Sequence, residues 1–266
     1  MRAETDLEAR PPLGVSLSDL LPWWIGLCLI AALAWVATIT WAGPMGVGPG
    51  TMGLSLAAFL FVWVVMMAAM MFPSVAPMAF VWIRSVAARP TTRGRVVGVA
   101  SFLSGYLLAW AAFGVAVYVV LLGAGRLAED APDVARWAGA AIFAVAGVYQ
   151  LTSLKGACLR HCRTPVGALF HYASYRGTGR DLRVGIHHGL YCVGCCWGLM
   201  IVLVAVGAMN VPVMVSLAGV ILIEKVWRHG AAFSRAVGVF LLVVAALVPF
   251  IPSLLPGLRA VPMSPM

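Results

Sequence analysis

Seven blocks of apolar residues dominate the chain, and most are about twenty residues long, the length a helix needs to cross a bilayer core. Because 62% of the 266 residues are hydrophobic and only 10% are charged, a water-soluble globule could not bury this apolar surface. We therefore predict an all-α, polytopic transmembrane helical bundle of about seven spans. The blocks lie at about 22–42, 53–83, 96–122, 135–153, 184–208, 211–228 and 236–256.

The second block is longer than a bilayer requires, and it contains Pro73 and Pro77. Proline removes a helical hydrogen bond and kinks or ends a helix. The block is therefore either one tilted, kinked helix or a helix followed by a shorter broken piece.

The basic residues alternate between the two sides that seven spans would create. Fifteen of the eighteen Lys and Arg residues fall in the N-terminal tail or in the segments 84–95, 154–183 and 225–235, and the other three are Arg126, Arg136 and Arg259. The positive-inside rule then places the N-terminus in the cytoplasm. We predict a cytoplasmic tail at 1–21, a transmembrane domain at 22–256 with a long cytoplasmic loop at 154–183, and a short external tail at 257–266. The net charge of +9 thus indicates orientation and not a nucleic-acid partner.

The segment from His187 to Met200 reads HHGLYCVGCCWGLM and has the highest density of metal-ligating residues. On a helix, His188, Cys192 and Cys195 share one stripe, with Cys196 at its edge. Neighbours one turn apart can chelate one ion, whereas residues seven apart lie about 10 Å apart and cannot. We predict these four residues as metal ligands, with His187 as an auxiliary one. The alternative is that the cysteines pack as small apolar residues, which is our expectation for the isolated Cys28.

Four methionines on the second block form a further soft-ligand candidate. Met66 and Met70 lie one turn apart, and so do Met67 and Met71, so either pair could offer thioethers to Cu(I). Methionine is also a common gap-filler in helical cores. We predict Met66 and Met70 as ligands and the other pair as auxiliary.

The long loop contributes Cys158, His161 and Cys162, and it also contains His171. One helical turn would aim both thiols at the same ion, while nearby Lys and Arg favour thiolate. We predict an auxiliary acquisition or delivery point here. The alternative is a pair of solvated thiols, because two cysteines alone do not define a zinc site.

Glu224 and Lys225 form a charged pair at the end of the sixth block. Counting 1.5 Å per residue along each span brings Glu224, His188, Cys192 and the methionines to a similar depth. Glu224 is either a boundary marker or a carboxylate that supports the metal site, with Lys225 neutralising it.

Other classes of chemistry lack support in the sequence. We find no Gly-rich phosphate loop and no GxSxG elbow, so neither nucleotide-driven nor serine chemistry is indicated, and no catalytic residue is predicted. Four of the six cysteines lie in or beside apolar blocks, and the other two are predicted to face the cytoplasm. Reduced thiols are therefore expected.

At these residues the chain resembles a bacterial family of predicted metal-binding integral membrane proteins, over roughly residues 55 to 250. The resemblance implies a metal-binding role in the bacterial cytoplasmic membrane. The Cys-Cys-Trp block is its most specific part. The matching motifs are Trp63 with Met66, Ala69 to Met71 and Pro73; Leu154, Lys155, Cys158, Cys162, Arg163 and Pro165; His188 with Cys192 and the run Cys195 to Trp197 ending at Met200; Gly207, Met209 and Asn210; and Glu224 with Lys225.

These observations favour a protein that binds a soft transition metal for transport, delivery or homeostasis. Cysteine, histidine and methionine together favour Cu(I), with Zn(II) next because thioether is a poor zinc ligand. A metal donor or acceptor protein is the expected partner besides lipid. Two alternatives stay open: a structural or accessory membrane subunit without metal, and a thiol-disulfide redox enzyme.

Overall fold

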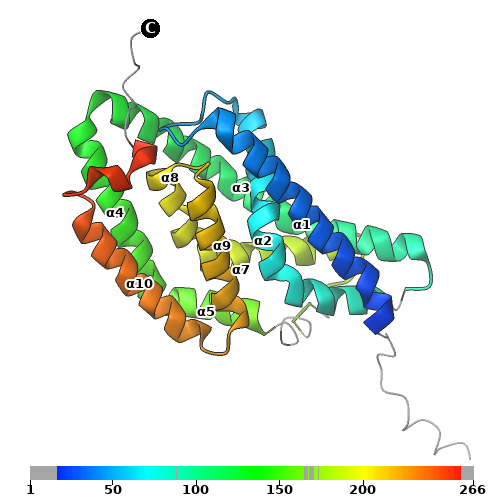
Figure 1. Cartoon of the computed structure of the whole chain (residues 1–266). Coiled ribbons are helices and arrows are strands. Elements are labelled where there is room, and N and C mark those ends of the chain that lie inside the picture. Colours follow the sequence, from blue (N-terminus) through cyan, green and yellow to red (C-terminus); the bar gives the residue numbers. More distant parts are fainter. Residues whose placement is uncertain (1–16, 88, 165–166, 168–170, 173, 259–266) are drawn as a thin grey trace, which may run out of the picture.

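All regular structure in the described residues is helical, which confirms the predicted all-α class. The computed structural model describes residues 17–87, 89–164, 167, 171–172 and 174–258. Most of the predicted tails at 1–21 and 257–266 therefore lie outside the described residues. The α-helices are α1 (Leu17–Met45), α2 (Leu56–Ala87), α3 (Thr92–Asp130), α4 (Pro132–Leu151), α5 (Ser153–Arg163), α7 (Arg180–Met200), α8 (Val202–Val206), α9 (Val211–Val226) and α10 (Gly230–Leu247), followed by two short 3-10 turns at Pro252–Leu254 and Pro256–Leu258 (Figure 1).

Six helical segments are long and apolar enough to cross a membrane: α1, α2, α3, α4, α7 continued by α8, and α10. The seventh predicted span corresponds to α9, which has only 16 residues. At 1.5 Å per residue this helix is about 24 Å long, shorter than a bilayer core of about 30 Å. Its start is fixed by Asn210, whose side chain accepts a hydrogen bond from the Val213 N–H, and its end by Trp227 in extended conformation.

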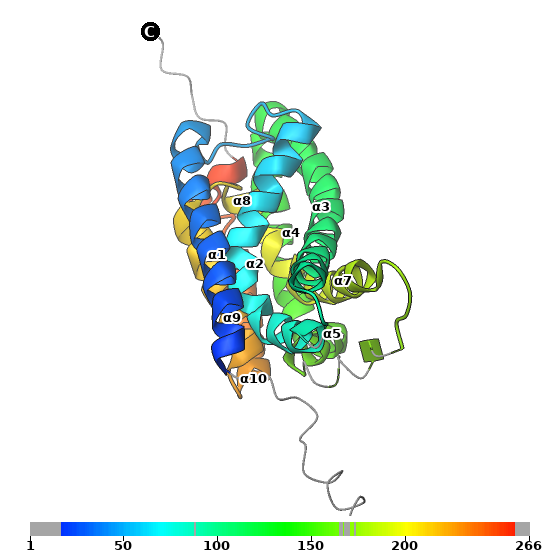
Figure 2. The same cartoon turned by 90° about the vertical axis from the view of Figure 1, so that its right-hand side faces the viewer.

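The second block folds as one continuous helix, α2, which passes through both Pro73 and Pro77. Figure 2 shows the lower part of this helix turning away from the line of its upper part, as two internal prolines would cause. α1 packs along α2 at the edge of the bundle and leaves many of its apolar side chains exposed. α2 is therefore the helix that carries much of the core.

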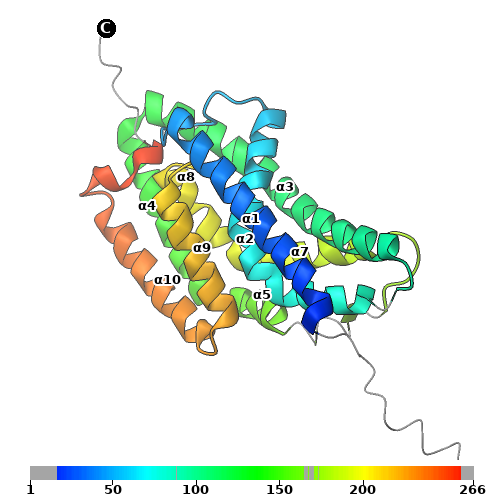
Figure 3. The ribbon, with the colours of Figure 1, turned by 45° about the vertical axis from the view of Figure 1, so that its right-hand side comes forward.

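The packing of α3 against α7 is unusually close, and glycines make it possible. A Cβ on Gly185 would lie 2.1 Å from the Phe102 carbonyl oxygen, and one on Gly105 would lie 2.2 Å from the Leu182 oxygen. A Cβ on Gly189 would likewise lie 2.7 Å from the Ala109 Cβ and 3.0 Å from the Tyr106 carbonyl oxygen. Figures 1 and 3 show α7 running at a large angle to α9. Residues along α7 therefore advance along the direction of α9 by less than the about 1.5 Å per residue of a parallel helix.

The predicted loop at 154–183 begins with a helix, α5. The Thr152 side chain caps it by accepting a hydrogen bond from the Lys155 N–H. α5 contacts α7 and α9, and it buries Lys155, Leu159 and Cys162. The first part of this segment is therefore packed within the bundle.

Candidate metal centre

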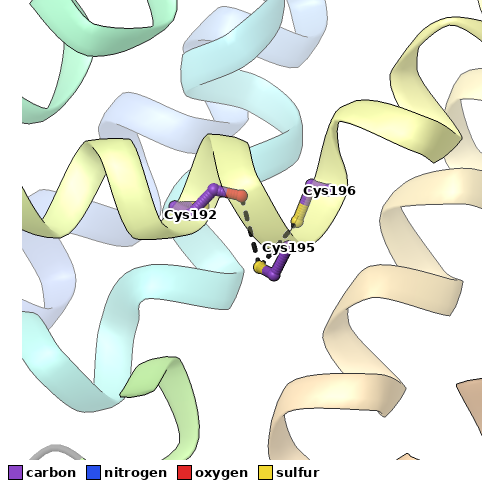
Figure 4. Close-up of side chains that lie close together, drawn as sticks. All are labelled: Cys192, Cys195 and Cys196. Atoms are coloured by element: carbon purple, nitrogen blue, oxygen red, sulfur yellow. Dashed lines mark hydrogen bonds between the residues drawn. The ribbon is translucent and has the colours of Figure 1, made fainter. Parts of the chain in front are cut away.

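Three cysteines of α7 bring their sulfur atoms together in the core. The Sγ atoms of Cys192, Cys195 and Cys196 all lie within 4.8 Å of one another, and each residue is at most 1% exposed (Figure 4). The Cys195 and Cys196 sulfurs are 3.3 Å apart. Sulfurs on one ion at about 2.3 Å would be separated by about 3.8 Å in tetrahedral geometry and about 4.6 Å in linear geometry. The three sulfurs are therefore close enough to hold one ion, with the Cys195 and Cys196 sulfurs about 0.5 Å closer than two ligands in tetrahedral geometry.

A fourth sulfur comes from α5. The Cys162 Sγ lies 3.8 Å from the Cys195 Sγ, and Cys162 is buried. Its predicted partner Cys158 lies instead against Gly194 of α7, where a Cβ would come within 3.0 Å of the Cys158 Sγ. Burial raises the pKa of the Cys158 thiol, which favours its protonated form. The structure thus separates the two loop cysteines and places only Cys162 beside the central cluster.

Two polar side chains surround the Cys192 sulfur. The Lys225 ammonium donates hydrogen bonds to the Cys192 Sγ at 3.0 Å and to the Ser74 hydroxyl at 3.2 Å. The Tyr106 hydroxyl lies 3.0 Å from the same sulfur. A cation beside a buried sulfur stabilises its thiolate form. Lys225 is therefore a partner of Cys192, and the expectation that it neutralises Glu224 is wrong.

Glu224 pairs with a different lysine. Its Oε2 accepts a hydrogen bond from the Lys155 Nζ at 2.7 Å, and its Oε1 accepts one from the Gln150 amide at 2.9 Å. Lys155 and Glu224 are each 1% exposed, so neither marks a solvent boundary. The network joins α4, α5 and α9. Glu224 therefore holds α5, and with it Cys162, in place, and no contact joins it to a histidine among the described residues.

The four methionines are buried on α2, each at most 2% exposed. Ser74, which contacts Lys225, lies on the same helix. At 100° of rotation per residue, the side-chain directions of Met67, Met70 and Met66 around the helix axis differ from that of Ser74 by about 20°, 40° and 80°. On a regular helix Met67 and Met70 would be turned toward the side of Ser74 more than Met66, so Met67 is a further candidate beside the predicted pair Met66 and Met70. Met71 lies one turn from Ser74, and its carbonyl oxygen accepts a hydrogen bond from the Ser74 hydroxyl.

His188 lies one turn before Cys192 and is 2% exposed. Its Nδ1 is buried and has no hydrogen-bond partner among the described residues. An unsatisfied buried nitrogen is costly, and a metal ion would satisfy it. His187 points elsewhere, toward the Tyr172 hydroxyl at 3.3 Å, and the His161 Nε2 lies 2.9 Å from that same hydroxyl.

No role was predicted from the sequence for three polar residues of these networks: Tyr106, Gln150 and Lys155, of which only Lys155 was among the matching motifs. A lysine and a glutamine beside an apolar block are costly in a membrane unless they are paired. Their presence alone could therefore have predicted that Lys155 and Gln150 have buried polar partners. Tyr106 gave no signal, because tyrosine is ordinary in an apolar span.

Comparison with known proteins gives one match. The model of a family described as PpoB2, copper chaperone, matches residues 60–248. The matched span contains every residue of the centre described above. No curated protein and no solved structure is significantly similar to the chain.

Proposed function

Because the chain belongs to the PpoB2 copper chaperone family, we propose that it binds Cu(I) inside a membrane and delivers the ion to another protein. The observation that carries this proposal is the buried cluster of Cys192, Cys195 and Cys196, whose sulfurs lie within 4.8 Å of one another. Cys162 supplies a fourth sulfur from a separate helix.

The donor set favours Cu(I) over other ions. Thiolate and thioether are soft ligands that select Cu(I), whereas Zn(II) accepts thiolate and imidazole but binds thioether poorly. The methionine stripe of α2 and the free Nδ1 of His188 extend the same soft set. Zn(II) is the second candidate because four sulfurs are also available for a tetrahedral site.

Lys225 balances the charge of the loaded centre. Two thiolates and one Cu(I) carry a net charge of −1, and an uncompensated charge in an apolar interior is expensive. The Lys225 ammonium, 3.0 Å from the Cys192 sulfur, makes the assembly neutral. The same ammonium favours the Cys192 thiolate before metal arrives, so the first ligand is ready for an incoming ion.

The protein is proposed to lie in the bacterial cytoplasmic membrane with its N-terminus and the segment 154–183 in the cytoplasm. The division of basic residues, fifteen to three, supports this orientation. α5 then lies at the cytoplasmic end, and Cys162 is the sulfur of the centre that comes from outside the long spans. Exchange with a donor or acceptor protein would pass through that side.

The test is copper stoichiometry and affinity of the reduced protein purified in detergent, measured by competition with a Cu(I) chelator. Cys192→Ser and the double variant Cys195→Ser/Cys196→Ser should lose high-affinity Cu(I), whereas Cys28→Ser, on exposed α1, should bind as the unsubstituted protein does. Unchanged copper content in both centre variants would replace the metal role with simple packing. A disulfide that forms among these cysteines and cycles with a quinone, with no metal bound, would favour the redox alternative.

A further inference from the structure

Three histidines outside the cysteine centre gather where α5, α7 and residues 171–172 meet. The ring centroids of His171 and His187 are 5.2 Å apart, those of His161 and His187 are 6.1 Å apart, and those of His161 and His171 are 6.4 Å apart. His171 is exposed, whereas His161 and His187 are half-buried. The group therefore runs from solvent toward the interior.

These separations are slightly larger than those of three imidazoles on one metal ion. A nitrogen at about 2.0 Å from an ion puts its ring centroid about 3.2 Å from that ion, so three rings lie about 5.2 Å apart at tetrahedral angles and about 5.5 Å apart in a trigonal plane. The ring nitrogens do not yet converge. Among the described residues, only the three cysteine sulfurs form a group of ligand atoms that all lie within 4.8 Å of one another. Binding requires the exposed His171 ring to turn.

Tyr172 prepares two of the rings for this role. Its side chain is fully buried, and its hydroxyl lies 2.9 Å from the His161 Nε2 and 3.3 Å from the His187 Nδ1. A hydroxyl that donates to one ring accepts from the other, so one neutral ring carries its proton on the nitrogen that faces the hydroxyl and the other carries it on the far nitrogen. One of them therefore always presents a lone pair on its far nitrogen.

The charges around the group favour a monovalent ion. Arg183 lies over the Tyr175 ring, 5.3 Å from its centroid, next to His171 and His187. The nearby carboxylate of Asp181 is already paired with Arg89 at 2.7 Å. Repulsion by a neighbouring guanidinium is half as large for Cu(I) as for a divalent ion.

We infer that His161, His171 and His187 form a second Cu(I) site, which receives the ion before it reaches the cysteine centre. The next step inward is His188, whose ring centroid is 6.1 Å from that of His161 and whose free Nδ1 lies one turn from Cys192. The binding site stands on the histidine geometry alone. The transfer step rests on the proposed function of the cysteine centre.

The direct test removes the cysteine centre. A variant with serine at 162, 192, 195 and 196 should still bind one Cu(I) per chain, with nitrogen ligands and no sulfur in X-ray absorption spectra. Adding His171→Gln and His187→Gln should abolish this binding. Adding His229→Gln, the exposed fifth histidine beside Trp227, should leave it unchanged. Binding that survives the first pair, or is lost equally with His229→Gln, would overturn the site.

A second measurement keeps the cysteines, in case the serine variant does not fold. Loading of the cysteine centre, followed by thiolate-to-copper absorption, should be slower in the His171→Gln/His187→Gln variant, while the final cysteine-bound copper is unchanged. An unchanged loading rate would overturn the transfer step. If the unsubstituted protein shows nitrogen-bound copper without any copper–sulfur signal, the proposed function of the cysteine centre fails and the histidine site stands.

Discussion

The cysteine centre and the histidine cluster lie on neighbouring turns of α7 and differ in almost every physical respect. The sulfurs are in the core, converge within 4.8 Å and lie beside a buried ammonium. The imidazoles are partly open to solvent, surround a tyrosine hydroxyl and do not yet converge. His187 and His188 are adjacent in sequence, yet 100° of helical rotation sends one to each region. One helix can therefore present an accessible, harder ligand set and a buried, softer one within a few residues.

The largest expected effect comes from breaking the ion pair that anchors α5, because this helix supplies both regions. Glu224→Gln leaves the Lys155 ammonium buried without a charge partner, so the free energy of unfolding should fall by about 3–5 kcal/mol. Denaturation in mild detergent, followed by far-ultraviolet circular dichroism, measures this change.

The matched control is Asp133→Asn, which removes an exposed pair with Arg136 and should change stability little. Copper binding should weaken at both regions in the Glu224 variant, since α5 carries Cys162 and His161. A variant as stable as the unsubstituted protein would show that Lys155 finds another partner.

The second prediction uses pH to tell the two regions apart. Each cysteine thiol that is still protonated must lose its proton to bind copper, so affinity should rise by up to about tenfold per pH unit for each such thiol, and Cys192 beside Lys225 contributes less. His161 is different: burial lowers its pKa, and His187 and His171 lower it further. It is therefore already neutral at pH 7, and its affinity for metal is lost only as pH falls through that lowered pKa.

Chelator competition at several pH values measures both slopes. Between pH 7 and 8 the unsubstituted protein should show a steep slope, and the variant with four serines a nearly flat one. Equal slopes would mean that the same groups bind copper in both proteins.

A smaller effect is expected at Lys225, which touches only the cysteine region. Lys225→Leu places an apolar side chain without a metal-ligating atom at this position and removes a charge-assisted hydrogen bond to the Cys192 sulfur. Such bonds contribute about 1.5–3 kcal/mol, so Cu(I) affinity at the cysteine centre should fall about tenfold or more. Nitrogen-bound copper in the four-serine background should be unaffected by the same change, and an equal loss in both backgrounds would indicate general unfolding.

The sequence predicted the helices well because apolar length is a local signal. Each of the seven blocks contains a helix, although 184–208 divides into α7 and α8, 236–256 ends in short 3-10 turns, and six segments are long enough to cross a membrane. The choice left open at Pro73 and Pro77 was settled in favour of one kinked helix. The polar α5 was missed because it is short and lies in a basic segment, although Thr152, a favoured N-cap residue, was a usable signal.

The site was only partly predictable, because its members come from different helices. The spacing of Cys192, Cys195 and Cys196 placed their sulfurs together on one helix, but nothing local indicated that Cys162 would join them. The pairing of Glu224 with Lys225 was expected from adjacency alone. Consecutive helical residues point about 100° apart, so the two side chains reach different neighbours, and this rule could have been applied beforehand.

The smallest predicted effect concerns the α2 methionines Met67 and Met70, which would add thioether ligands to a centre already built from cysteine sulfurs. Met67→Leu/Met70→Leu keeps the apolar volume of two fully buried side chains and removes only their thioethers, so stability should change by less than about 1.5 kcal/mol. Cu(I) affinity should fall a few-fold and Zn(II) affinity should not, because thioether is a ligand for the softer ion alone. Met66→Leu is the control on the same helix, since it is turned further from Ser74. Parallel titrations with both metals, in protein whose cysteines are intact, measure the difference. If Met66→Leu weakens Cu(I) more than the Met67/Met70 pair does, the stripe that faces the cysteines is the one first predicted, and the rotation of α2 inferred from Ser74 is wrong. If neither change affects copper, the methionines only fill the core, and the soft ligands of the centre are the sulfurs of the cysteines.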